Sequence, residues 1–132
     1  MRKSPYYTSS IPFILKYHFN MFHSRLYKIL TNKELKDFAR DKIFRGNDID
    51  RYCGYIHLSA NPQQYNHVIK KYYNTHQEVN VLELDDSKML NVTYYKGCPH
   101  YYGKLYWYHI LNSVKITNPL YLKDGIILSF EE

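Results

Sequence analysis

Two helix-start signals, at Thr31 and Asn61, divide this chain into short segments and so limit the folds that it can form. Thr31-Asn-Lys-Glu34 is a capping box, in which the threonine and glutamate side chains satisfy amide groups left free at a helix start. Asn61 precedes Pro62, which is well tolerated at the first helical position because the amide hydrogen that it lacks would have no partner there. The pattern predicts one helix over about residues 32–41 and a second helix that begins at residue 62.

Short β-prone segments lie around these two helices. We expect strands over residues 25–30, 54–59, 79–84, 92–95, 113–117 and 126–130, a further short helix over 105–111, and a polar surface loop over 43–51. The strands and helices do not alternate regularly, and the sequence contains no internal repeat. This order favours an α+β domain over a doubly wound parallel sheet.

Length and composition indicate one domain. The chain has 132 residues, of which 45% are hydrophobic, which is enough for one core and too little for two. Its apolar stretches are too short to span a bilayer. Two cysteines fit a reducing compartment better than a disulfide framework. We therefore expect a single globular domain over residues 25–132, located in the cytoplasm.

The net charge of +6 comes from the start of the chain. Residues 1–33 hold six lysines and arginines and no acid, whereas the remainder holds 12 basic and 12 acidic side chains. A surface that tracks a phosphate backbone needs a local surplus of lysine and arginine, so the neutral body disfavours RNA or DNA as a partner. We interpret residues 1–24 as a basic leader, either disordered or targeting. A mitochondrial transit peptide has this composition, and translation from Met21 instead of Met1 would omit most of it.

Two short strings carry most of the functional information: Gly54-Tyr-Ile-His-Leu-Ser59 and Pro99-His-Tyr-Tyr-Gly103. Alternate side chains of an extended backbone share a face, so each string separates polar from apolar residues. The polar face holds Tyr55, His57 and Ser59 in the first string, and His100 and Tyr102 in the second. A strand divided in this way can form the floor of a pocket, and an ordinary half-buried strand shows the same division.

Three interpretations of these histidines stand side by side. The two histidines line a ligand pocket, or are structural side chains with backbone partners, or join the two cysteines at a zinc site. The zinc ligands would be Cys53, His57, Cys98 and His100. Their spacings, C-x3-H and C-x-H, lack the C-x2-C pairing of ordinary structural zinc sites, so we expect no metal.

The order of these motifs resembles one family, the small bacterial and fungal proteins grouped as domain of unknown function 952. That family combines an opening strand, a helix, a Gly-aromatic-Ile-His-Leu-Ser strand, a glutamine-bearing helix, a further strand and a Pro-His-[Leu/Tyr]-Tyr-Gly segment. The corresponding segments here are Leu26–Thr31, Gly54–Ser59, Gln63 or Gln64, Val81–Asp85 and Pro99–Gly103. The resemblance covers about residues 25–117.

The resemblance implies a fold similar to that of ADP-ribosyltransferases and RNA 2′-phosphotransferases, which bind NAD in a cleft between two small sheets. We therefore expect two small, mostly antiparallel sheets with two or three short helices around a cleft. The cleft would bind NAD or a related nucleotide, and any reaction would resemble ADP-ribosyl transfer or 2′-phosphate transfer. The expected catalytic residues are His57, Ser59 and His100, and the expected cofactor-binding residues are Tyr27, Lys28, Tyr55 and Tyr102.

In this hypothesis His57 hydrogen-bonds the ribose, Ser59 and Tyr102 orient the base or a phosphate, and Lys28 contacts the pyrophosphate. Relatives carry an aromatic-glutamate pair before the Pro-His segment, whereas this chain has Tyr94-Tyr95. A carboxylate at that position would stabilise the positive charge that develops on the ribose during ADP-ribosyl transfer. Its replacement favours binding over turnover. The alternative is a non-catalytic module that binds a metabolite or a protein and uses the histidines structurally.

Overall fold

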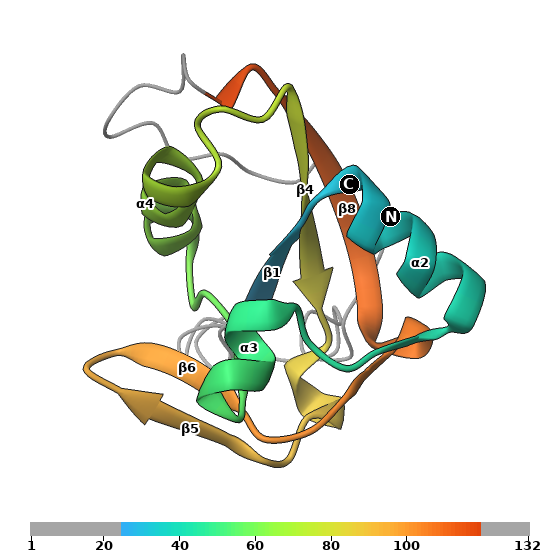
Figure 1. The fold of residues 1–132 in the computed structure, drawn as a ribbon. Helices are drawn as coiled ribbons and strands as arrows, with labels where there is room; N and C mark the ends of the chain where they lie inside the picture. Colours follow the sequence, from blue (N-terminus) through green and yellow to red (C-terminus); the bar gives the residue numbers. More distant parts are fainter. Residues whose placement is uncertain (1–24, 120–132) are drawn as a thin grey trace, which may run out of the picture.

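The computed structural model describes residues 25–119 (Figure 1). The basic leader over residues 1–24 and the strand expected over residues 126–130 lie outside the described residues. Within the described part, no helix is both long enough and apolar enough to cross a membrane. The described chain has the expected α+β class, with small antiparallel sheets and few helices.

The main sheet has the strand order β1-β4-β8 and is antiparallel throughout. β1 spans Leu26–Leu30, β4 spans Glu78–Leu84 and β8 spans Ile110–Thr117. In the register of β1 with β4, Lys28 lies opposite Leu82. β4 is the central strand and pairs with β1 on one side and with β8 on the other, and six of its seven residues are buried.

Helices cover both faces of this sheet, and Figure 1 shows them on opposite sides of it. α4 (Pro62–Tyr72) packs on one face and α2 (Asn32–Asp41) on the other. Alternate residues of each strand enter one of the two cores, because successive side chains of a strand point in opposite directions. The core under α4 consists of Tyr27, Ile29, Tyr65, Ile69, Val79 and Val81. The core on the other face includes Leu26, Leu30, Phe38, Leu82 and Leu84.

A second antiparallel sheet has the order β3-β6-β5 and lies at the bottom of Figure 1. β3 spans Ile56–His57, β5 spans Val92–Tyr95 and β6 spans Cys98–Tyr101. Lys96 and Gly97 form the turn between β5 and β6, and both have positive φ angles, as hairpin turns that follow the twist of their strands require. Two backbone hydrogen bonds of 2.8 Å between Tyr27 and Ser59 connect this second sheet to β1.

The prediction of a surface loop over residues 43–51 is wrong. Ile43–Phe44 forms β2, which pairs with β7 (Leu105–Tyr106), and Asp48–Cys53 forms helix α3. Asn47 and Asp50 form a capping box at the start of α3, with aspartate in place of the usual glutamate. The segment is polar because most of α3 faces solvent, and this polarity resembles that of a loop.

The prediction of a helix over residues 105–111 is also wrong. The chain forms β7, a single 3-10 turn (η3, Trp107–His109) and then the start of β8. The buried imidazole of His109 accepts the amide hydrogen of Tyr106 at 2.9 Å and so closes the turn after three residues. The other elements expected within residues 25–119 are confirmed, although only Ile56 and His57 of the string Gly54–Ser59 are in a regular ladder. Asp86–Lys88 forms a further 3-10 turn, η2.

Candidate functional site

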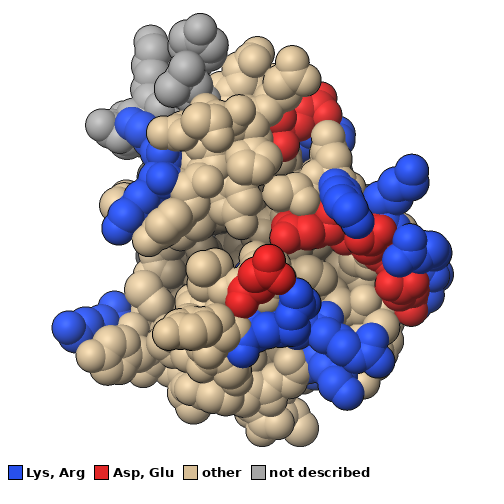
Figure 2. All heavy atoms as spheres, in the orientation of Figure 1, with Lys and Arg blue, Asp and Glu red and all other residues tan. Residues whose placement is uncertain are grey.

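A pocket of about 510 Å³ lies where β1, the start and middle of α3, β3 and the end of α4 meet. Its size is typical of small-molecule sites, which range over about 300–1,000 Å³. Figure 2 shows that this face of the molecule is hollowed near its centre, while acidic and basic side chains gather together over α2 on the right. The lining residues are Tyr27, Lys28, Ile29, Asn47, Ile49, Asp50, His57, Leu58, Ser59, Val68, Tyr72 and Tyr73.

The carboxylate of Asp50 lies at the base of this pocket and is bound by its neighbours on every side. It is 2% exposed. Oδ1 accepts from the backbone amide of His57 at 3.0 Å and lies 2.7 Å from Nδ1 of the same residue. Oδ2 accepts from the amide of Asn47 at 3.1 Å. The ammonium of Lys28 donates to both oxygens, at 3.2 and 2.9 Å. Asp50 thus fixes strand β1, helix α3 and strand β3 to one another.

Lys28 is equally enclosed, with 5% of its surface exposed. Its ammonium contacts both oxygens of Asp50 and donates to the carbonyl oxygen of His57, which lies 2.9 Å from Nζ. Burial lowers the pKa of Lys28, and the carboxylate of Asp50 offsets only part of that effect.

Burial pushes the pKa of Asp50 upward, but the charge of Lys28 and the hydrogen bonds from His57 outweigh it, so the pKa is lowered overall. Asp50 is therefore a carboxylate at neutral pH and accepts a hydrogen from Nδ1 of His57. This assigns the Nδ1–H tautomer to the neutral ring and leaves Nε2 able to accept a hydrogen bond. The side chain of His57 is 38% exposed and lines the pocket, so Asp50 orients a ring that a ligand can reach.

Gly46, one residue before the cap of α3, is required for this arrangement. Its φ is +106°, and a Cβ atom there would lie 2.8 Å from Cβ of Asp50. Gly46 also accepts a hydrogen bond from the guanidinium of Arg51 through its carbonyl oxygen. Both the backbone conformation and the space are available only to glycine.

We expect Gly46→Ala to lower the free energy of unfolding by about 2–4 kcal/mol, because it adds a steric clash with Asp50 to the strain of a positive φ. Gly54→Ala is the matched control. Gly54 ends α3 with a φ of +85°, and a Cβ atom there would meet no other atom within 4 Å, so only the strain of about 1–2 kcal/mol applies. Urea denaturation of both variants checks this expectation, and equal losses would contradict the close approach to Asp50.

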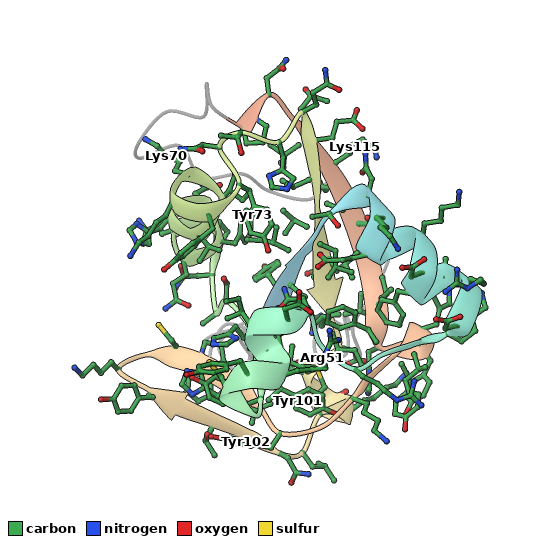
Figure 3. The ribbon with its side chains drawn as sticks, in the orientation of Figure 1. Arg51, Lys70, Tyr73, Tyr101, Tyr102 and Lys115 are labelled. Carbon is green, nitrogen blue, oxygen red and sulfur yellow. The ribbon has the colours of Figure 1, made fainter. Side chains whose placement is uncertain are left out.

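An aromatic cluster of Tyr55, His57, His100 and Tyr102 adjoins the pocket at His57. The ring of Tyr55 stacks on His100 with centroids 3.9 Å apart and planes 19° apart. Its centroid lies 4.6 Å from that of His57 and 5.4 Å from that of Tyr102. The register of β3 with β6 places His57 opposite His100, and burial and then the nearby His57 lower the pKa of His100. Figure 3 shows Tyr102 near the lower edge of the molecule.

The structure brings the residues predicted from sequence into two adjoining groups. Tyr27, Lys28, His57 and Ser59 line the pocket. Tyr55, His100 and Tyr102 are absent from its lining and meet His57 in the aromatic cluster. The predicted division of the first string is confirmed at Ile56, which is buried in the core, and at the half-buried His57. It does not separate Leu58 from Ser59, because both are buried and both line the pocket.

Sequence reasoning missed Asp50, whose segment was assigned to a loop. The signal that could have identified it is the spacing of Asn47 and Asp50, which is that of a capping box. It also missed Tyr73, which follows α4 and lies between that helix and the main sheet in Figure 3. Burial, together with the carboxylates of Glu34 and Asp50, raises the pKa of Tyr73 to about 12. Its phenol is therefore a neutral hydrogen-bonding group in the pocket.

The two cysteines, Cys53 and Cys98, are exposed and form no disulfide. Over residues 25–119, no three side chains of histidine, cysteine, aspartate or glutamate are grouped so that they could hold a metal ion. The four zinc ligands considered from the sequence are thus not assembled into a site. Tyr95, at the position where the resemblance implied a glutamate in relatives, is exposed on β5, and its ring centroid lies 6.2 Å from that of His100.

Solved structures with the same fold include three of protein CC0527 from Caulobacter crescentus. An X-ray structure has a TM-score of 0.64 and 22% identity, covering 70% of this chain and 85% of that chain. An X-ray structure of a double mutant has a TM-score of 0.63 and 23% identity over the same shares. The solution NMR structure has a TM-score of 0.58 and 24% identity, covering 68% of this chain and 82% of that chain. At these identities the similarity shows the fold alone.

No curated protein matches the chain. A family model does match it, over residues 29–113, within the range in which the sequence resembles that family. The matched segment includes the pocket residues from Ile29 to Tyr73 and the whole aromatic cluster. The chain belongs to the DUF952 family, whose members are described as proteins of unknown function.

Proposed function

We propose that the pocket binds the nicotinamide-riboside end of NAD or a related nucleotide, in a cleft like that of ADP-ribosyltransferases. The observation that carries this proposal is the 2.7 Å contact between Asp50 and Nδ1 of His57 in a pocket large enough for a small molecule. A buried carboxylate that orients an accessible imidazole is a feature of ligand and catalytic sites, because it fixes which ring nitrogen meets the ligand. A histidine that only supports the fold through a backbone hydrogen bond does not require such a buried carboxylate.

Each group has a separate role in this proposal. Nε2 of His57 accepts a hydrogen bond from a ribose hydroxyl, and Ser59 and Tyr27 border the same part of the pocket. The aromatic cluster offers a surface on which a second planar ring can stack. Lys28 positions Asp50 and does not contact the pyrophosphate, because its ammonium is buried and ion-paired with Asp50.

The arrangement supports binding more strongly than ADP-ribosyl transfer. That reaction needs a carboxylate able to face the ribose as positive charge develops on it. Tyr95 supplies none, and both oxygens of Asp50 are occupied by Lys28 and backbone amides. If the protein has turnover, His57 is the residue placed to move a proton, with Asp50 as its orienting partner.

We expect His57→Ala to weaken NAD binding about two- to tenfold, because a hydrogen bond between neutral groups contributes about 0.5–1.5 kcal/mol. Titration calorimetry on the full chain measures the dissociation constant. His67→Ala is the matched control, since His67 is exposed on α4 and outside the pocket lining. A dissociation constant unchanged by His57→Ala, together with a large drop in melting temperature, would favour the alternative of a non-catalytic module with structural histidines.

A further inference from the structure

We infer, on the basis of the proposed nucleotide binding, that the pocket recognises the base and ribose of its ligand and excludes phosphate, so that a nucleoside binds as well as its phosphorylated forms. The ligand class is then a nucleoside, or a nucleotide whose phosphates point into solvent. The observations that carry this inference are the charges on the pocket wall and the partners that they already have.

Lys28 is the only lysine or arginine among the described residues that line the pocket. Its ammonium lies within 3.2 Å of both oxygens of Asp50 and 2.9 Å from the carbonyl oxygen of His57. The ammonium is thus buried and ion-paired, so a phosphate oxygen could reach it only by displacing Asp50. A phosphate that displaced Asp50 would leave a buried carboxylate without its partner, which is strongly unfavourable.

Helix α3 does not offer a positive end to an anion. Its first turn holds Asp48 and Asp50, whose negative charges oppose the partial positive charge of a helix start. Arg51 is engaged within the same helix, donating to Asp48 at 2.6 Å and to the carbonyl oxygen of Gly46. Asp50 is paired with Lys28 and Asp48 with Arg51, so this wall offers no unpaired positive charge to a phosphate monoester, which carries about −1.5 to −2 at neutral pH.

The rest of the lining suits a planar ring with hydroxyl groups. Ile29, Leu58 and Val68 are apolar. The phenol of Tyr73 stays protonated, because burial and the carboxylates of Glu34 and Asp50 raise its pKa to about 12. Phenols, the hydroxyl of Ser59 and the imidazole of His57 hydrogen-bond to ribose and to base edges without needing a charge on the ligand.

Calorimetry with two matched series tests this inference on the full chain: adenosine, AMP and ADP, and nicotinamide riboside with its mononucleotide. Within the series that binds, we expect dissociation constants to agree within about threefold, because a charge-assisted phosphate contact would contribute about tenfold or more. Phosphorylated forms that bind more than tenfold more tightly than the nucleoside would overturn the inference and leave the proposed function standing. Failure of every member to bind would overturn both.

A cation added at the rim gives a second, independent reading. Ile49 lines the pocket and is 64% exposed, whereas Tyr52 lies on the same helix, is 90% exposed and is outside the lining. We expect Ile49→Lys to increase the preference for the mononucleotide over the nucleoside at least threefold, and Tyr52→Lys to leave it unchanged. Equal preferences in both variants would contradict placement of the ligand beside α3.

Discussion

Replacing Asp50 by asparagine is expected to lower the free energy of unfolding by about 3–5 kcal/mol, because it leaves a buried ammonium without its counter-charge. Asparagine keeps nearly the same shape, but its single carbonyl oxygen can accept from the backbone amide of either Asn47 or His57 and not from both. The change therefore removes the charge that faces Lys28, which is 5% exposed, together with one of these two hydrogen bonds. Urea denaturation measures this loss of unfolding free energy directly, provided that the dependence of the free energy on urea concentration is the same in both proteins.

The double variant Lys28→Met/Asp50→Asn separates loss of the ion pair from loss of structure. Removing both charges together removes the unpaired ammonium, and buried ion pairs replaced as a unit often cost little. We expect the double variant to regain at least half of the stability lost by Asp50→Asn, which is the non-additivity of residues in direct contact. A loss below about 1 kcal/mol for Asp50→Asn alone would contradict the buried pair.

The ion pair of Lys28 and Asp50 also predicts how the stability lost by Asp50→Asn changes with pH. The pKa of Asp50 is lowered in the folded protein, so its contribution to stability is fully present above the pKa of an unfolded aspartate, about 3.9, and is lost as the pH falls through the folded value. The gap in stability between the wild-type protein and Asp50→Asn should therefore shrink as the pH falls below about 4. A constant gap down to pH 2 would mean that Asp50 is not ionised in the fold.

The second large effect is expected at the centre of the main sheet. Leu82 lies on β4, is 0% exposed and packs in the core under α2. Leu82→Ala removes buried apolar atoms and leaves a cavity between elements that cannot collapse freely, so we expect a loss of about 2–5 kcal/mol. Thermal or urea unfolding measures it.

Leu90 provides the matched control because it is 90% exposed just after η2. Leu90→Ala should change the free energy of unfolding by no more than about 0.5 kcal/mol. Similar losses for Leu82→Ala and Leu90→Ala would contradict the placement of β4 as the central strand.

The sequence was sufficient where a local signal determines the local structure. The capping box at Thr31 and the Asn61-Pro62 pair start helices at the predicted positions. The alternation in Gly54–Ser59 correctly separates buried Ile56 from His57, because a strand alternates its side chains whatever its partners are. The family was also identified correctly from the order of the motifs.

The sequence was insufficient where contacts between distant segments determine the local structure or the geometry of the site. The contact of Asp50 with Lys28 joins residues 22 positions apart, and no local pattern reports it. The stretch from Leu105 to His109 looks helical until β2 pairs with Leu105 and Tyr106 and holds them extended. The pocket lies beside the bridge between Tyr27 and Ser59, which joins two sheets, and both residues line it. The role of Lys28 changes for the same reason, from a predicted phosphate contact to a proposed support for Asp50.

The central claim is that Asp50 orients His57 for a ligand in the pocket, and nitrogen NMR of the imidazole rings tests it most directly. The free full-length protein is measured at about pH 8.5, where ordinary imidazole is neutral, and then with saturating NAD or nicotinamide riboside. The structure predicts a proton on Nδ1 of His57, and a shift of its Nε2 signal on addition of ligand while His67 stays unchanged. A proton on Nε2 in the free protein, or a His57 signal unmoved by either ligand, would contradict the account.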